Sequence, residues 1–338
     1  MNILIITQYF WPENFRINDL ASGLREKGHT VSVLTGIPNY PDGKFYKGYG
    51  LRNKRCEDYG GIPLYRVPLA PRGKGTGFRL ALNYLSFAVA ASMWGPFLCK
   101  DKYDVIFVYE PSPITVGIPA IVMKRIKTAP VMFWMQDLWP ESLTAAGAVR
   151  SKIVLKLFEV LVSIIYRSCD IILAQSRAFI SNIRRVAGES KQVYYFPNSA
   201  EELYRPITVK PDARERMHMP PGFRVLFAGN IGAAQDFPTI LETAEKLKDN
   251  PDIQWVILGD GRLHRWLDEQ VEVRGLRNTV HLIGRHPAET MPRFFALADA
   301  LLVTLKKEPI FSLTIPSKVQ SYLACAKPVI AALDGEGA

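Results

Sequence analysis

Short apolar runs alternate with amphipathic segments along most of this chain, and no other feature limits the fold as strongly. Asn2 to Thr7 is apolar, and it is followed by an amphipathic segment from Phe15 to Lys27, by Gly28-His29 and by a second apolar run, Val31 to Leu34. This order is typical of a βαβ unit, in which a helix connects two parallel strands. We therefore expect an α/β protein with doubly wound parallel sheets.

The pattern occurs in two series. The first continues with segments at Val105–Tyr109, Ile114–Arg125, Val131–Met135, Ile153–Ser168, Ile171–Ala174, Arg177–Val186 and Val193–Phe196. The second has apolar runs at Val225–Ala228, Gln254–Leu258, Val280–Ile283, Ala300–Val303 and Pro328–Leu333, with helical segments at Pro238–Lys248, Arg262–Val273 and Met291–Ala298.

Residues 201–221, between the two series, are rich in proline and charge and have little periodicity. This predicts a Rossmann-like domain over residues 1–200, a linker over 201–221 and a second Rossmann-like domain over 222–338, facing each other across a cleft. Because only Asp334 to Ala338 follow the last apolar run, we expect the second domain to be truncated and to lack its closing helices.

The excess of positive over negative charge is confined to the first half of the chain. The net charge is +10, yet residues 1–200 hold 25 Lys and Arg against 14 acids, whereas residues 201–338 hold 17 against 18. Residues 44–102 alone carry 11 basic and three acidic side chains, and they include the uncharged run Leu80 to Cys99. Basic residues beside an apolar helix favour contact with an anionic membrane surface.

The run Leu80 to Cys99 has three interpretations. Its 20 residues are close to the length of a membrane span, but Asn83, Ser86 and Gly95-Pro96 oppose one, so a buried or membrane-facing helix is favoured over a span or ordinary core. The start of the chain has no basic leader and no cleavage site, and its four cysteines lack CxxC spacing. We expect a cytoplasmic protein with reduced thiols, peripheral on the inner face of the cell membrane.

Glycine turns follow three successive apolar runs of the second series. They are Gly229-Asn230-Ile231-Gly232, Gly259-Asp260-Gly261-Arg262 and Gly284-Arg285. Each could be a tight βα turn only, but three of them at strand ends favour backbone amides that approach a diphosphate. Ile315-Pro316-Ser317-Lys318 then opens a helix, with Ser317 suited to an N-cap and Lys318 suited to an anion rather than to the helix dipole.

These motifs together resemble family 4 retaining glycosyltransferases with the GT-B fold. G-N-x-G, V-I-L-G-D-G, L-I-G-R, P-S-K and K-P-V-I match the nucleotide-sugar half, and the match extends over the whole chain. In the first half, Gln8-Tyr9-Phe10, Pro12-Glu13, Thr35 to Pro41, Asn83 to Phe87 and Gln136 to Ser142 resemble the branch that builds lipid-linked surface polysaccharides in bacteria, such as O-antigen, capsule and colanic acid.

The resemblance implies transfer of a sugar from a nucleotide-diphosphate donor to a hydroxyl acceptor with retained configuration and without an essential metal or other cofactor. It implies donor binding by Gly229, Asn230, Gly232, Asp260, Gly261, Gly284, Arg285, Pro316, Ser317 and Lys318. Catalysis would need charge neutralisation of the leaving diphosphate by amides, Lys318 and Arg285 more than a nucleophile.

Candidate acceptor residues lie in the first half. Asp137 and Glu141 follow an apolar run and are candidates to orient the acceptor hydroxyl or to take its proton, although capping by Asp137 and a surface position for Glu141 are alternatives. Candidate acceptor-binding residues are Glu13, Asn39, Tyr40, Gln136 and Trp139. A rigid proline-flanked loop explains Asn39 and Tyr40 equally well, and aromatic residues such as Trp139 are more often core.

The sequence also departs from the family pattern. Asn230 and Gln235 stand where many members have Arg and Lys for the diphosphate, and Leu313 and Ser321 stand where paired glutamates are usual. Glu308 lies nearby but out of register, and the five histidines have no metal-ligand spacing.

We therefore predict a glycosyltransferase that uses a nucleotide sugar and a polyprenyl-diphosphate-linked acceptor at a membrane. The alternatives are a nucleotide-sugar epimerase of the same fold and a catalytically degenerate membrane-associated scaffold. Nucleic-acid binding is disfavoured, because the basic region contains no recognisable module for it.

Overall fold

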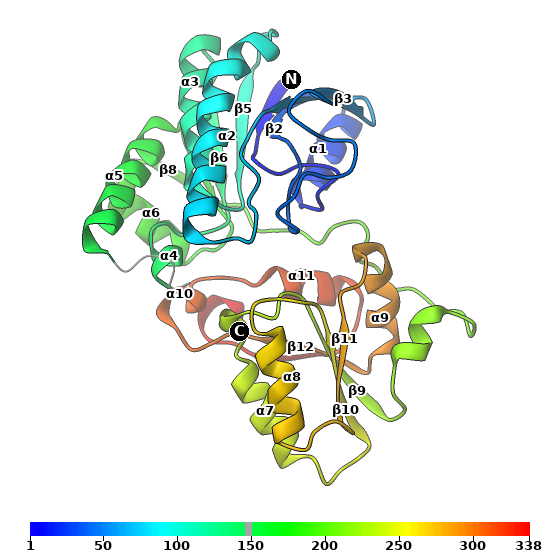
Figure 1. Cartoon of the computed structure of the whole chain (residues 1–338). Coiled ribbons are helices and arrows are strands. Elements are labelled where there is room, and N and C mark those ends of the chain that lie inside the picture. Colours follow the sequence, from blue (N-terminus) through cyan, green and yellow to red (C-terminus); the bar gives the residue numbers. More distant parts are fainter. Residues whose placement is uncertain (146–150) are drawn as a thin grey trace. The chain divides into compact units, whose positions relative to one another are not determined.

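The chain folds into two α/β units, Met1–Pro197 and Asn198–Ala338. Its structure is a computed structural model that describes residues 1–145 and 151–338 (Figure 1). The boundary lies at Pro197, so the Pro-rich residues 201–221 belong to the second unit, where Arg214–His218 form a short 3-10 helix.

The first unit contains an eight-stranded sheet in the order β3-β4-β2-β1-β5-β6-β7-β8. All neighbouring strands pair in parallel except β3, which is antiparallel to β4. The strands are β1 (Asn2–Ile6), β2 (Thr30–Gly36), β3 (Cys56–Tyr59), β4 (Ile62–Val67), β5 (Val105–Glu110), β6 (Val131–Met135), β7 (Ile171–Ala174) and β8 (Gln192–Tyr195). Every residue of β5 is buried, as is usual for a central parallel strand covered on both faces.

The connecting helices of this unit are α1 (Ile17–Glu26), α2 (Gly77–Leu98), α3 (Gly117–Lys127), α4 (Glu141–Ala145), α5 (Lys152–Ser168) and α6 (Phe179–Ala187). Right-handed crossovers place α1 on one face of the sheet and α2, α3, α5 and α6 on the other. Packing follows this order, because α2 contacts α3, α3 contacts α5, and α5 contacts α6 (Figure 1).

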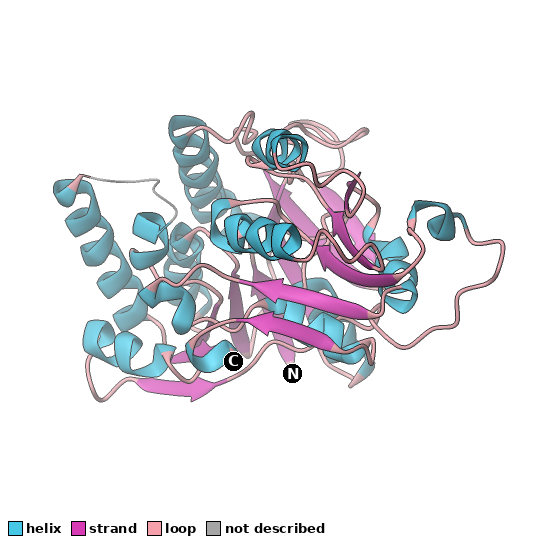
Figure 2. Cartoon of the chain, turned by 90° about the horizontal axis from the view of Figure 1, so that it is seen from below, coloured by secondary structure: helices cyan, strands magenta, loops and turns pink. Residues whose placement is uncertain are grey.

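The second unit contains a five-stranded, wholly parallel sheet in the order β11-β10-β9-β12-β13 (Figure 2). Its strands are β9 (Phe223–Ala228), β10 (Ile253–Leu258), β11 (Val280–Gly284), β12 (Ala300–Thr304) and β13 (Val329–Ala332). Its helices are α7 (Phe237–Lys246), α8 (His264–Val273), α9 (Met291–Leu297), α10 (Pro309–Ser312) and α11 (Ser317–Ala324). Side chains of α7 and α8 pack into one core cluster, and those of α9 and α11 into another on the opposite face.

The α/β prediction is confirmed, and each strand predicted from an apolar run is present with ends within two residues of those expected. The short strand β3, with the sequence CEDY at the sheet edge, was not predicted, because it lacks apolar alternation. The run Leu80 to Cys99 forms most of α2. Among the helices that the structure describes, none is long and apolar enough to cross a bilayer.

Candidate functional site

The glycine turns of the second unit lie side by side at the carboxyl ends of β9, β10 and β11. The Gly229 amide donates to the Leu258 carbonyl at 2.9 Å, and the Gly259 amide donates to the Gly284 carbonyl at 2.8 Å. The Ile231 amide donates to the Asp260 carbonyl at 2.8 Å. Hydrogen bonds therefore join the three turns that the sequence placed at successive strand ends.

Close backbone approach explains two of these glycines. Gly259 has a φ of +139°, and a Cβ there would lie 1.8 Å from the Gly229 carbonyl oxygen. A Cβ at Gly261 would lie 2.4 Å from the Ile231 carbonyl oxygen. Because no side chain fits at such distances, these glycines are required for packing of turn against turn, whatever ligand the turns bind.

Gly229 instead makes room for Lys318. A Cβ at Gly229 would lie 2.7 Å from the Lys318 Cε. The Lys318 Nζ donates to the Gln235 Oε1 and lies 3.6 Å from the centre of the Phe227 ring. Burial lowers the pKa of Lys318 to about 7. With this pKa, the amine and ammonium forms of Lys318 are both populated near pH 7, so an anion that binds beside the glycine turn can shift the side chain fully to the ammonium form at low cost in free energy.

The other predicted donor residues lie at the same carboxyl edge of the second sheet. Asn230, Asp260 and Arg285 are exposed just beyond β9, β10 and β11, and the Asp260 Oδ1 accepts a hydrogen bond from the Gly261 amide at 2.7 Å. Pro316 is the N-cap of α11, and Ser317 is its first helical residue, which corrects the expectation that Ser317 caps this helix. Gln235 was not predicted as a site residue, because its contact with Lys318 joins positions 83 residues apart.

A second group of side chains lies at the carboxyl edge of the first unit, beyond β5 and β6. Asp137 is half-buried, and burial raises its pKa to about 6. Glu110, the last residue of the neighbouring strand β5, is fully buried. Burial raises its pKa well above the ordinary value, the negative charge of Asp137 raises it further, and the nearby backbone amides of Asp137 and Gln136 lower it in part. Glu110 was not predicted as a site residue, although the sequence has this acid at the end of an apolar run.

The remaining residues beyond β6 have structural contacts. The Glu141 Oε1 accepts from the Asn182 amide group at 3.2 Å and pairs with Arg185 at 3.4 Å. Trp139 is buried, and its ring lies 5.7 Å from that of Phe158. Gln136 is half-buried at the same turn. Asp137 precedes α4 by four residues, which places it outside the cap position of that helix.

Glu13 and Asn39 hold the loop that follows β2. The Glu13 Oε1 accepts from the Asn39 and Tyr40 amides at 2.7 Å each, and burial raises the Glu13 pKa to about 7. Asn39 is fully buried and donates to the Ile37 carbonyl at 3.0 Å. Tyr40 is the exposed member of the group. These contacts favour the rigid-loop interpretation for Asn39, with Glu13 as the residue that holds the loop, and they leave the Tyr40 ring accessible.

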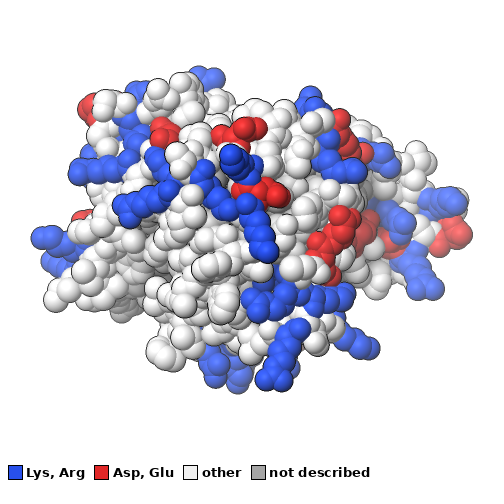
Figure 3. All heavy atoms as spheres, turned by 90° about the horizontal axis from the view of Figure 1, so that it is seen from above, with Lys and Arg blue, Asp and Glu red and all other residues white. Residues whose placement is uncertain are grey.

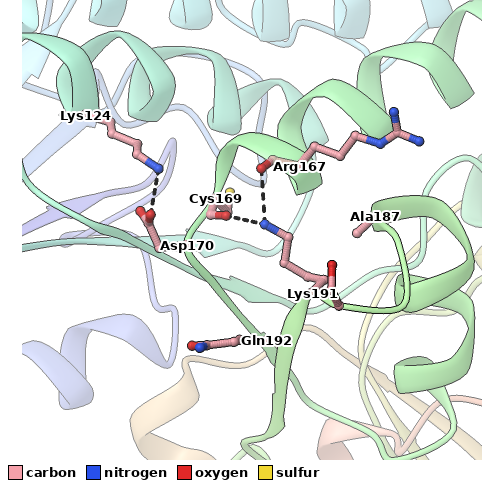
Figure 4. Close-up of a pocket in the computed structure, with 8 residues that line it drawn as sticks. Lys124, Arg167, Cys169, Asp170, Ala187, Lys191 and Gln192 are labelled. Atoms are coloured by element: carbon pink, nitrogen blue, oxygen red, sulfur yellow. Dashed lines mark hydrogen bonds and ion pairs between the residues drawn. The ribbon is translucent and has the colours of Figure 1, made fainter.

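A polar cavity lies at the opposite edge of the first sheet, beside the amino ends of β7 and β8 (Figure 4). The Lys124 Nζ contacts Asp170 at 2.8 Å, and the Lys191 Nζ donates to the Cys169 and Arg167 carbonyls. The lysines that line this cavity are thus bound to the protein itself. Within residues 1–145 and 151–338, no group of three His, Cys, Asp or Glu side chains is arranged to hold a metal ion.

Two family models match this chain. A glycosyl transferase 4-like domain matches residues 14–199, and a domain of the glycosyl transferases group 1 matches residues 222–337. The Escherichia coli (strain K12) protein WcaI, named for colanic acid biosynthesis, is 25% identical over 96% of this chain and 81% of its own length. The Pseudomonas aeruginosa protein WbjE, named as a glycosyltransferase, is 29% identical over 59% of this chain and 50% of its own length.

Solved glycosyltransferases have the same fold. HepE of Anabaena, solved in complex with UDP and glucose, has a TM-score of 0.66 and 17% identity over 99% of this chain and 82% of its own. WaaG, a glycosyltransferase involved in lipopolysaccharide biosynthesis, has a TM-score of 0.62 and 14% identity over the same shares. The GT-B fold that was expected from the motifs is thereby confirmed.

Gly259→Ala tests the close approach of the turns. We expect the free energy of unfolding to fall by about 2–4 kcal/mol, because the new Cβ meets the Gly229 carbonyl in a backbone conformation that side chains avoid. Gly284→Ala is the matched control: its φ is +81° and nothing lies within 4 Å, so only strain of about 1 kcal/mol is added. Equal losses in urea unfolding of the two variants would contradict this account.

Lys318→Met tests the role of the buried ammonium. We expect the variant to melt about 2–4 °C higher than the wild type at pH 7, because it removes a charge that burial disfavours. This gain in melting temperature should shrink as pH rises from 7 to 10, where only the unfolded state holds the Lys318 proton.

The same variant tests phosphate binding. UDP should raise the melting temperature of the wild type and of the exposed control Lys306→Met, but not that of Lys318→Met. An undiminished UDP shift in Lys318→Met would refute the phosphate role.

Proposed function

This chain belongs to the glycosyltransferase family defined by the two domains above, and on that premise we propose that it transfers a sugar from a nucleoside-diphosphate sugar to a polyprenyl-diphosphate-linked saccharide with retention of configuration. The reaction would contribute to bacterial surface polysaccharide, as the names of WcaI and WaaG suggest for those proteins. The observation that carries the donor half is the ammonium group of Lys318, which is held against the Gly229 turn.

We assign the donor diphosphate to the second unit. In the proposed reaction the bond from the anomeric carbon to the diphosphate breaks, and negative charge grows on the leaving phosphate. Lys318, Arg285 and the turn amides would stabilise that charge without a metal ion. HepE, which has the same fold, was solved with UDP and glucose.

The departures from the family pattern lie near the same turn. Gln235 contacts Lys318, so an amide occupies the place of a second cation beside that lysine. Ser321 is buried and donates to the Ser317 carbonyl at 3.3 Å, which makes it a helix residue and not a substitute for a donor-binding glutamate. Glu308 is exposed at the N-cap of α10.

We assign the acceptor to the first unit, where Asp137 would position the acceptor hydroxyl and take its proton as the new glycosidic bond forms. A half-buried carboxylate with a pKa of about 6 is ionised at neutral pH and is still basic enough for this task. Tyr40 is placed to contact the acceptor saccharide from the loop that follows β2.

The membrane part of the proposal rests on the outer face of α2. This helix exposes apolar side chains at helical spacing along its whole length: Phe78, Leu82, Leu85, Val89, Met93, Trp94 and Phe97. Phe78 is 78% exposed and Phe97 is 70% exposed. Such an uninterrupted stripe is unusual on a water-facing helix, and basic residues Lys74, Arg79, Lys100 and Lys102 stand at its two ends.

A second apolar stripe, which was not predicted from the sequence, lies on α5. Ile153, Leu157, Val160 and Ile164 are exposed at successive turns, and Lys152 and Lys156 accompany them. Because α2 and α5 cover the same face of the first sheet, both stripes belong to one side of this unit. Lys and Arg predominate over Asp and Glu on the face shown in Figure 3. An anionic lipid surface at the inner face of the cell membrane would suit the two apolar stripes and the basic residues that lie beside each of them in the sequence.

A transfer assay tests the proposed reaction and the role of Asp137 as its general base together. Labelled UDP and GDP sugars are incubated with vesicles that contain a polyprenyl-diphosphate-linked saccharide, and the lipid product is measured. We expect a labelled lipid product whose rate falls as pH drops through about 6, because Asp137 becomes protonated. Asp137→Asn should lower kcat by about 100-fold or more and remove this acid limb, whereas the exposed control Asp101→Asn should change neither.

The same assay separates the alternatives. A sugar nucleotide that isomerises without acceptor would indicate an epimerase, and the absence of both product and donor turnover would indicate a scaffold. Either result would overturn the proposed function.

Vesicle flotation tests the membrane contact. The wild type should bind phosphatidylglycerol vesicles at low salt and lose affinity as salt rises. Leu85→Ser with Val89→Ser on α2 should weaken binding about tenfold, because two side chains lose their apolar contact with lipid. The matched pair Leu323→Ser with Ile330→Ser, also exposed but in the second unit, should have no effect. Failure of the wild type to bind would exclude the membrane contact.

A further inference from the structure

Arg72 lies in the segment between β4 and α2 and is enclosed by three tyrosine rings. Its guanidinium carbon is 5.7 Å from the ring centre of Tyr9, 5.0 Å from that of Tyr40 and 6.0 Å from that of Tyr84. The Arg72 Nη1 donates to the Tyr9 hydroxyl at 2.6 Å, and the Arg72 backbone amide donates to the Asn39 Oδ1 at 3.1 Å. These contacts hold the side chain in one position.

This guanidinium is bound to a tyrosine hydroxyl and not to any carboxylate of the described residues. It is half-buried, and among the residues that the structure describes no Asp or Glu forms an ion pair with it. Glu13, the acid that holds the neighbouring loop, is bound to the Asn39 and Tyr40 amides. A guanidinium has five N–H donors, and the hydrogen bond to Tyr9 uses one of them. Tyrosine faces offset part of the cost of removing such a charge from water, but they do not satisfy its donors.

The chemistry of a planar, partly desolvated guanidinium points to a phosphate. Its fork of N–H groups matches two phosphate oxygens, and a charge that is already held in place loses little entropy on binding. Side chains that face this position offer aromatic faces and hydroxyl groups, which also suit a saccharide or a lipid phosphate.

Arg72 lies at the carboxyl edge of the first sheet, the edge at which ligands bind in open α/β sheets. Tyr9, Tyr40 and Arg72 follow β1, β2 and β4, which are neighbours in the sheet, so their carboxyl ends meet at one edge. Asp137 lies beyond β6 at the same edge. Tyr84 belongs to α2, within two turns of Phe78, where the exposed apolar stripe begins.

We propose that Arg72 binds the diphosphate of the lipid-linked acceptor, held for this purpose by the Tyr9 hydroxyl and the cage of Tyr9, Tyr40 and Tyr84. This inference rests on the proposed function, since it assumes an acceptor that carries a lipid diphosphate. It adds a phosphate site in the first unit, next to the start of the apolar face of α2. The phosphate at Arg72 would then mark the junction between the saccharide and the hydrocarbon chain.

Binding of farnesyl diphosphate to the full chain, measured by calorimetry without vesicles, tests the site. Arg72→Gln should weaken this binding about tenfold to a hundredfold, through loss of charge-assisted hydrogen bonds. The control Lys74→Gln removes an exposed charge two residues away and should have little effect. Tyr9→Phe, which keeps the ring and removes the hydroxyl that orients Arg72, should weaken binding by a smaller factor. Circular dichroism of each variant verifies folding, and Arg72→Lys supplies a variant that keeps the charge and loses the fork.

Two further measurements distinguish the sources of phosphate. Farnesol should bind the wild type and Arg72→Gln equally, and flotation with phosphatidylglycerol vesicles should be the same for both proteins. In the transfer assay Arg72→Gln should raise the KM for the lipid-linked acceptor and leave the KM for the donor unchanged. Unchanged farnesyl diphosphate binding, or a loss confined to vesicle binding, would overturn the inference. If wild-type protein forms no lipid product while farnesyl diphosphate binding still depends on Arg72, the proposed function fails and the phosphate site stands.

Discussion

Parallel pairing of strands is the constraint on which the rest of this structure depends. A parallel strand must be followed by a crossover, so every crossover from a given sheet begins at the same edge. In the first unit that edge collects residues that follow β1, β2, β4, β5 and β6, and in the second it collects the glycine turns after β9, β10 and β11. Residues far apart in sequence therefore become neighbours without any local signal that links them.

Side chains collected at these edges are partly buried, and burial disfavours their charged forms. Burial raises the pKa of Asp137 and Glu13 and lowers that of Lys318, so each of these groups is less stable as an ion here than in water. The buried carboxylate of Glu13 accepts hydrogen bonds from two amides of the loop that it holds, and these bonds offset part of the cost of its burial. Asp137 and Lys318 lack an oppositely charged partner among the contacts described above. A buried ionisable group without such a partner, at the sheet edge where ligands bind, is a candidate for binding or catalysis, because either role would explain why the unfavourable burial is retained.

The sequence predicted elements well where burial is complete and local. The central strands are apolar over most of their length, and the glycine turns could be placed because each follows such a run. It failed for β3, whose residues alternate between exposed and half-buried without being apolar. Site residues were predicted as candidates but not as contacts, because the partners of Glu13 and Lys318 lie 26 and 83 positions away. The glycines illustrate the difference: their positions were evident, yet the need for Gly259 comes from the Gly229 carbonyl, which no pattern in the sequence reveals.

The division of charge between the two halves has a physical explanation in the proposed reaction. The donor is a soluble anion, and a single lysine beside glycine turns can bind it in a unit whose basic and acidic residues are almost balanced. The acceptor in the proposal is anchored in a bilayer, so the unit that meets it needs both apolar contact and attraction to anionic headgroups.

The two units differ in how their exposed apolar side chains are distributed. In the described part of the first unit these side chains form stripes on α2 and α5, whereas those of the second unit, such as Met217 and Val273, are scattered over separate elements. Because headgroup attraction decays within a Debye length, the basic side chains must lie near the apolar stripe to act together with it, as Lys74 and Arg79 do at the start of α2. Within the proposed function, the excess charge of the first half is therefore better explained by a membrane surface than by the nucleotide.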